Sequence, residues 1–136
     1  MMKERYAHRY ILKISTGICL LAVLLFLLTG CGTSSVFDGS RIANASEFQM
    51  EYSVLDREET ADMVLEAGDQ LRITLSHTAG TVDVTVGLKG KEPIYRGNRQ
   101  QNAGFMLVID ETGNYQISVS GHQAKGSVSF TRISGQ

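Results

Sequence analysis

The sequence has 136 residues and a formal net charge of −1, and this length indicates one domain. Beyond residue 31 it carries nine Lys and Arg against thirteen Asp and Glu, which argues against nucleic acid as a partner because phosphates require a basic face. Both cysteines, Cys19 and Cys31, lie in the first 31 residues, so packing rather than disulfide bonds must stabilise the part that follows.

Residues 1–30 have the layout of a secretory signal. Four basic residues precede position 14, and an uninterrupted apolar block follows over 17–28. A basic start, a short apolar block and a small-residue site are typical of export, and we expect a signal helix here, outside the folded domain. By length alone an uncleaved transmembrane anchor stays open, since about 17 apolar residues are enough at the short end.

The segment Leu28-Thr29-Gly30-Cys31 ends this block with an aliphatic residue, a small residue, glycine and cysteine. It resembles the lipobox of bacterial lipoproteins. The resemblance implies cleavage between Gly30 and Cys31, with acyl chains such as palmitate on Cys31. It also implies export to the outer face of the cell membrane, of Gram-positive type, or to the outer membrane if the source is Gram-negative. An ordinary secretory signal with an incidental cysteine is the alternative.

The chain after the signal divides into a tether and a folded domain. Residues 32–46 are rich in Gly, Ser, Asn and Ala and have no sustained period, which predicts a flexible tether over 31–46 beginning with the lipidated cysteine. The folded domain is expected over 47–136. The acidic balance does not favour anionic lipid, so the membrane would be a partner only through the acyl chains on Cys31.

From residue 47 onward apolar and polar residues alternate, as in strands with one buried and one solvated face. Residues 56–69 fit a strand better than a short helix because Ala61, Met63 and Leu65 alternate. With turn signals between the runs, the pattern predicts an all-β fold, a small antiparallel β-sandwich of jelly-roll or Greek-key type. The strands, about eight in number, are expected near 47–55, 60–66, 70–77, 81–87, 92–96, 104–110, 114–120 and 124–133.

Two short turn motifs in this region precede expected strands. Ala67-Gly68-Asp69 leads into one expected strand, and Gly113-Asn114-Tyr115 enters a late one. With these two motifs the domain resembles the GOLD-like and pre-peptidase C-terminal families of small β-sandwiches. The resemblance implies a sandwich that acts as a binding or accessory module, and it names no ligand. Tyr115 is expected to bury its ring and to reach backbone with its hydroxyl at a corner of the sandwich.

No set of residues indicates catalysis or a metal. His77 at the end of a strand and His122 after a glycine are expected to be exposed loop residues, without a cysteine or HxxxH spacing to complete a zinc site. No G-x-S-x-G elbow is present, and turn aspartates such as Asp69 commonly bond their own backbone. We predict no catalytic residue, no metal and no cofactor.

The best candidate for a binding surface is the segment over 95–104, expected as a loop between two strands. Arginine and amide side chains suit carboxylates or sugar hydroxyls, and binding residues concentrate on loops held by rigid scaffolds. A solvated hairpin loop without function is the alternative. The candidate ligand residues are Tyr95, Arg96, Arg99, Gln100, Gln101 and Asn102.

These features predict a membrane-anchored surface lipoprotein that acts as a non-enzymatic binding module of the cell envelope. Its expected partner is an envelope polysaccharide or a protein. An inhibitor or accessory subunit of another exported protein is the alternative, and a small hydrolase is a third hypothesis, because a catalytic set assembled from distant residues leaves no local motif.

Overall fold

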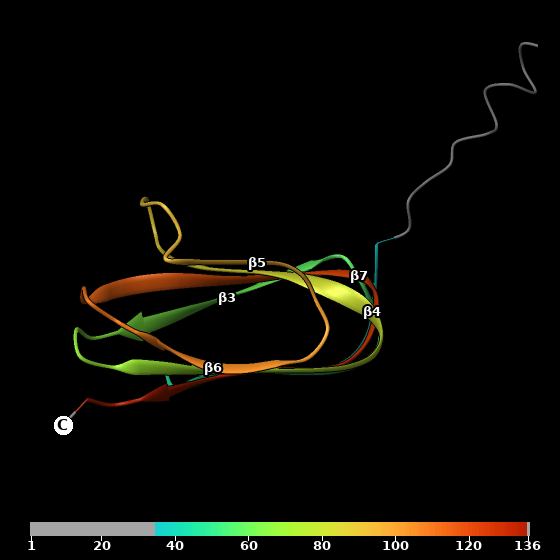
Figure 1. Ribbon diagram of the computed structural model, residues 1–136, viewed down its shortest axis with the longest axis horizontal. Helices are drawn as coiled ribbons and strands as arrows, with labels where there is room; N and C mark the ends of the chain where they lie inside the picture. The colour runs from blue at the N-terminus through green and yellow to red at the C-terminus, as the bar shows by residue number, and fades with distance from the viewer. Residues whose placement is uncertain (1–34, 136) are drawn as a thin grey trace, which may run out of the picture. The chain divides into compact units, whose positions relative to one another are not determined.

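The computed structural model describes residues 35–135 (Figure 1). The signal segment, the expected cleavage site at Gly30 and Cys31, and the first residues of the expected tether lie outside the described residues. Within 35–135 no helix is long and apolar enough to cross a membrane.

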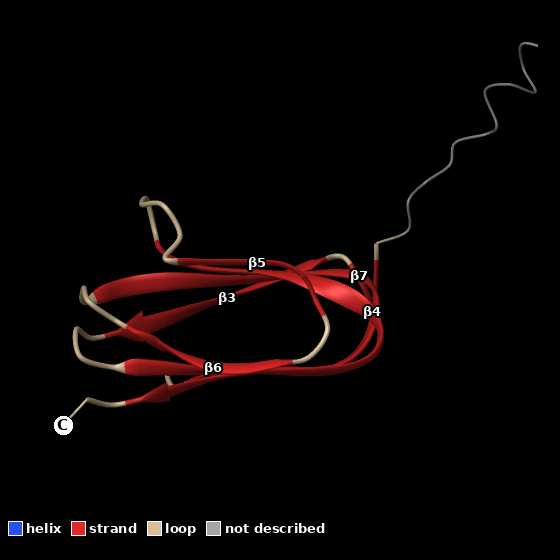
Figure 2. Ribbon diagram, viewed as in Figure 1, coloured by secondary structure: helices blue, strands red, loops and turns tan. Residues whose placement is uncertain are grey.

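The described residues form an antiparallel sheet of seven strands, and none of them is helical (Figure 2). Every strand pairs with a neighbour that runs in the opposite direction. The strands are β1 (Val36–Ala43), β2 (Glu47–Asp56), β3 (Glu58–Leu65), β4 (Gln70–Leu88), β5 (Tyr95–Gln100), β6 (Ala103–Val108) and β7 (Gly113–Ile133).

The sheet folds into two layers because two strands are long enough to run through both. β4 has 19 residues and β7 has 21, and both bend at the same end of the domain (Figure 1). The first layer contains β1, β2, the second half of β7, the first half of β4, and β6, in that order. The second layer contains β3, the first half of β7, the second half of β4, and β5. The all-β sandwich predicted from the sequence is confirmed.

At the bend in β4 the core-facing residues change from odd-numbered to even-numbered positions. Because side chains alternate strictly along a strand, such a change requires irregular pairing. The register of β4 against β7 shifts between His77 and Ala79 and again between Ala79 and Thr81, and Gly80 has a φ of 64°. Bulges of this kind turn the strand into the other layer. The core residues before and after the bend are Leu71, Ile73 and Leu75, then Val82, Val84 and Val86.

Aromatic side chains from both layers fill the core. Phe48 and Phe130 stack with their ring centroids 5.7 Å apart. Tyr115 is buried, and its hydroxyl donates a hydrogen bond of 2.7 Å to the backbone carbonyl of Glu111. Burial raises the pKa of Tyr115. The corner role expected for this tyrosine is confirmed.

Several element boundaries differ from the sequence prediction. Residues 36–43 were expected in a flexible tether, but they form β1 and pair with β2, because the outer edge of β2 provides backbone partners that the local sequence does not reveal. The turns expected near 77–81 and 121–123 are bends inside continuous strands, so two pairs of expected strands are each one strand, and the unexpected β1 brings the total to seven instead of about eight. The strand expected at 92–96 begins only at Tyr95, whereas β3 confirms the strand over 56–69.

Candidate functional site

The segment predicted as a binding loop, residues 95–104, is mostly strand. Its two flanks pair with opposite halves of β4, so the segment lies along the scaffold instead of projecting from it. The ring of Tyr95 packs on Phe105 with centroids 4.8 Å apart and is partly buried against the core. The prediction of a long loop is therefore wrong. Tyr95, Arg96, Arg99 and Gln100 lie in β5, and Gln101 and Asn102 form the turn before β6.

Both turn residues are used to hold the bend of β4. The backbone carbonyl of Gln101 accepts a hydrogen bond of 2.6 Å from Nδ1 of His77, and the side-chain carbonyl of Asn102 accepts one of 2.9 Å from the His77 backbone N–H. The Gln101 amide also donates to the backbone carbonyl of Gly80 at 3.3 Å. These contacts leave little of the turn free for a ligand.

His77 is a buried residue, contrary to the exposed loop position expected for it. Its side chain is in the interior with 7% of the residue exposed. A backbone carbonyl can only accept, so Nδ1 carries the proton and Nε2 accepts from the hydroxyl of Tyr52 at 2.5 Å. Tyr52 is also buried, and desolvation raises its pKa. The pair is a structural element that joins β2, the bend of β4 and the β5–β6 turn.

The two arginines of β5 contact different carboxylates, and one of these carboxylates also contacts a second histidine. Arg96 pairs with exposed Glu92 at 3.2 Å. The Asp83 carboxylate accepts from the backbone N–H of Arg99 at 2.7 Å and lies 2.8 Å from Nε2 of His122. The backbone hydrogen bond from Arg99, followed by the contact with His122, lowers the pKa of Asp83. His122 is exposed, as predicted, but it lies within β7 and not in the loop expected for it.

A broad concave surface lies elsewhere, on the outer face of the first layer. We call it the outer groove. It has a volume of about 560 Å³ and crosses β1, β2, β7 and β4 beside the bend. Its lining residues are Asp38, Gly39, Ser40, Glu51, Tyr52, Ser53, Ser76, Thr78, Lys125, Gly126 and Ser127. A smaller hollow of about 240 Å³ continues it along the strands and shares Ser40, Glu51 and Ser127.

The strand register explains why hydroxyl groups gather in the outer groove. Ser127 of β7 is paired with Glu51 of β2 on one side and with Ser76 of β4 on the other, and Ser40 of β1 is paired with Glu51. Directly paired residues project from the same face of a sheet. A row of polar side chains therefore crosses four strands, and the small size of its three serines leaves the face hollow.

Most polar groups of this row have hydrogen-bonding capacity to spare. The hydroxyl of Ser53 donates to the carboxylate of Asp38. The side chains of Ser40, Glu51 and Ser127 make no hydrogen bond or ion pair with other residues in the described part of the chain. The wall therefore presents donors and acceptors to whatever occupies the groove.

The sequence contains no pattern that distinguishes the residues of the outer groove from other exposed strand residues. Its residues are the solvent-facing positions of four strands, and any exposed strand face reads as alternating polar residues. His77 was detectable in principle, because it continues the series Leu71, Ile73 and Leu75 at the same spacing and so belongs on the inner face.

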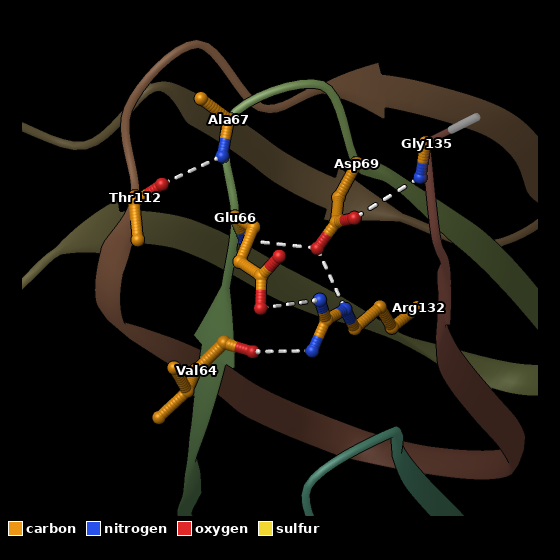
Figure 3. Close-up of polar contacts among 7 residues, drawn as sticks. All are labelled: Val64, Glu66, Ala67, Asp69, Thr112, Arg132 and Gly135. Atoms are coloured by element: carbon orange, nitrogen blue, oxygen red, sulfur yellow. Dashed lines mark hydrogen bonds and ion pairs between the residues drawn. The ribbon is translucent and has the colours of Figure 1, made fainter.

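A separate polar cluster joins the chain end to the β3–β4 turn (Figure 3). Asp69 is buried, accepts from the backbone N–H groups of Glu66 at 2.8 Å and Gly135 at 3.1 Å, and lies 2.6 Å from Nε of Arg132. The hydrogen bond from Glu66 is the main cause that lowers the pKa of Asp69. All of its contacts are made within the domain, so the cluster is structural, as a turn aspartate is expected to be.

Two kinds of reactive cluster are missing from the described residues. No group of three or more His, Cys, Asp and Glu residues there is placed to hold a metal ion. Over 35–135 the side-chain partners of the two histidines are Tyr52 and Asp83, and no serine or threonine hydroxyl bonds to either ring. The arrangement that activates a hydroxyl nucleophile is thus missing from this part of the chain.

Comparison with known proteins gives similarity of structure only. No family model matches the sequence, and no curated protein matches it. The fold is similar to PliG, a periplasmic lysozyme inhibitor of g-type lysozyme from Aeromonas hydrophila, with 16% identity, a TM-score of 0.46, and coverage of 66% of this chain and 89% of that one. It is also similar to the pre-peptidase C-terminal domain of a collagenase from Bacillus anthracis, with 10% identity, a TM-score of 0.45, and coverage of 68% and 91%.

Proposed function

We propose that this protein is a lipid-anchored, non-enzymatic binding module of the cell envelope, and that its outer groove binds a hydroxyl-rich ligand of the glycan class. The observation that carries the proposal is the row of Ser40, Glu51, Ser127 and Ser76 across four strands. The anchoring part rests on the resemblance of Leu28-Thr29-Gly30-Cys31 to a lipobox.

The chemistry of the outer groove favours a glycan over a strongly charged ligand. Hydroxyl groups both donate and accept, which complements the hydroxyls of a sugar chain. The two acidic residues of the wall, Asp38 and Glu51, are opposed by one cation, Lys125, so a polyanion or a polycation gains little. The volume of about 560 Å³ is within the range of ligand sites.

The shape of the site also bears on affinity. The one aromatic residue of the wall, Tyr52, is buried and bonded to His77, so it is not available for stacking on a sugar ring. Binding would depend on hydrogen bonds in an open groove, and each contributes only about 0.5–1.5 kcal/mol net. We therefore expect weak binding of single chains, strengthened where many anchored copies meet one polymer.

The anchor is tested by replacing Cys31 with serine in the full chain. The parent is expected to incorporate labelled fatty acid and lose its first 30 residues, whereas Cys31→Ser should do neither. If the Cys31→Ser protein remains membrane-bound and processed like the parent, the lipoprotein assignment is wrong.

The outer groove is tested by filling it. Ser127→Leu removes a hydroxyl and places a larger side chain in the row, and Ser120→Leu is a matched control because Ser120 lies on the same strand, is half-buried like Ser127 and belongs to the other layer. Binding to an array of envelope glycans, followed by titration of any glycan that binds, should fall about tenfold or more for Ser127→Leu alone. An equal loss in both variants, or none in Ser127→Leu, would reject the site.

An inhibitor or accessory subunit is the second candidate, favoured by a different feature. The loop between β4 and β5, residues 89–94, stands out from the second layer (Figure 1), and Ile94 in it is 49% exposed. A projecting loop with an apolar side chain suits insertion into a protein partner. Capture of one exported protein that is lost with Ile94→Asp and kept with Ser127→Leu would favour this function over glycan binding.

A further inference from the structure

The two layers have four edge strands among the described residues, β1, β3, β5 and β6, and three of them are protected against pairing with another chain. Charged side chains and irregular pairing are the usual protection of an edge. β1 carries Asp38 and Arg41 with a register shift after Asp38, β3 carries acidic residues at 58, 59 and 62, and β5 carries Arg96 and Arg99.

β6 lacks every one of these protections. Its sequence, AGFMLV, contains no charged residue and no proline, and its pairing with β4 is regular. Among the described residues β4 is its only strand partner, so the backbone groups on its other side face outward. An edge of this kind is a template for one more strand.

The side chains of β6 are apolar on both of its faces. On the outer face Met106 is 47% exposed and Val108 is 59% exposed. On the inner face Phe105 and Leu107 pack on the core but are only partly buried, since no further strand covers them on that side. A strand added to this edge must therefore offer apolar side chains at both alternating sets of positions.

We propose that β6 is a homodimerisation edge, and that it pairs antiparallel with β6 of a second copy so that the first layers of both molecules join. Among the edge strands of the described domain, β6 is the one whose alternating side chains are apolar on both faces. A second β6 therefore offers the apolar side chains that the first one requires on both faces of an added strand. The contact is self-complementary, as a two-fold interface requires.

The charges that flank β6 favour the antiparallel arrangement. The chain before β6 ends in the neutral amides Gln101 and Asn102, and the chain after it continues through Asp110 and through Glu111, whose carboxylate pairs with Lys91 at 2.7 Å. Antiparallel pairing places the acidic end of one copy beside the amide end of the other. Parallel pairing would instead place the acidic ends side by side, where like charges repel each other.

The size of the contact indicates a weak dimer. The six residues of β6 extend about 20 Å at roughly 3.4 Å per residue. A contact of this length and one strand wide buries less surface area than a standard stable interface. We expect a dimer that forms with increasing concentration, and lipid anchoring in one membrane plane, if the proposed function holds, would raise the local concentration.

The test compares two exposed valines on edge strands. Val108→Lys places a charge at the proposed contact, and Val64→Lys places the same charge on β3, where Val64 is 56% exposed. The full chain in detergent is examined by sedimentation velocity over a range of concentrations, with circular dichroism to compare folding. The dissociation constant of the dimer should rise about tenfold or more with Val108→Lys and change little with Val64→Lys.

A second measurement identifies the neighbour directly. With p-benzoylphenylalanine in place of Met106, irradiation of cells should give a crosslinked product of two copies of this chain. A monomer at every concentration, a dimer that Val108→Lys leaves unchanged, or a crosslink formed only with a different protein would overturn the proposal. Because sedimentation of the full chain in detergent requires neither a glycan nor a membrane surface, its outcome is independent of the proposed function.

Discussion

The buried hydrogen bond between Tyr52 and His77 gives a prediction whose size follows from the structure. Tyr52→Phe removes the hydroxyl and keeps the ring. Nδ1 of His77 is committed to the carbonyl of Gln101, so Nε2 loses its only donor in a position where 7% of the residue is exposed. A buried polar group left without a partner costs about 1–3 kcal/mol, and we expect the free energy of unfolding to fall by that amount.

Tyr115→Phe is the matched control. The hydroxyl of Tyr115 donates to the carbonyl of Glu111, and Glu111 is exposed, so water can replace the lost donor there. Its loss should be near the net value of a hydrogen bond, about 0.5–1.5 kcal/mol, and thus smaller than that of Tyr52→Phe.

The assay is urea unfolding of residues 35–136, with thermal unfolding as a second measurement. In a domain of about 100 residues each kcal/mol lowers Tm by roughly 4–8 °C. A Tyr52→Phe change below about 0.5 kcal/mol, or one no larger than that of Tyr115→Phe, would refute the view that this pair holds the bend of β4.

Two further predictions concern the bend and the chain end. Gly121→Ala should destabilise the domain by about 1–3 kcal/mol, because the new Cβ would lie 2.3 Å from the carbonyl oxygen of Leu55, whereas Gly104→Ala has open space and serves as the control; equal urea midpoints for the two variants would contradict this. The pKa of Asp69 is lowered in the folded protein, so its stabilising effect is complete above the ordinary aspartate pKa of about 3.9 and is lost as pH falls through the folded value. Asp69→Asn should flatten this acid limb of the stability curve, and an unchanged limb would show that other groups cause it.

The sequence predicted the strands of the core well, because a face buried against another layer requires an apolar residue at every second position. β2, β3, β6 and both halves of β4 and of β7 lie at or near the ranges expected from this alternation, whereas β5 overlaps its expected range by only two residues. β1 was missed because Phe37 is the one large apolar residue that it packs against the core. A single apolar residue cannot show the alternation by which a strand is predicted.

The candidate site was predicted less well. Arginines and amides over 95–104 pointed to a loop, but the structure uses Gln101 and Asn102 to hold His77, and Tyr95 packs into the core. The outer groove was not foreseen, because Ser127 and Glu51 are far apart in the sequence and become neighbours only through the register of β2 against β7.

The sequence by itself determined which segments form strands and which of their residues face the core, through the alternation of apolar and polar residues. It also contains the lipobox-like segment on which the proposed anchor rests. The tertiary structure alone decided that residues 70–88 form one bent strand, since the change from odd to even buried positions fits a turn as well as a bulge until the pairing with β7 is known. It also decided which polar residues share the outer groove and which edge is unprotected, because strand order and register depend on contacts between distant parts of the chain.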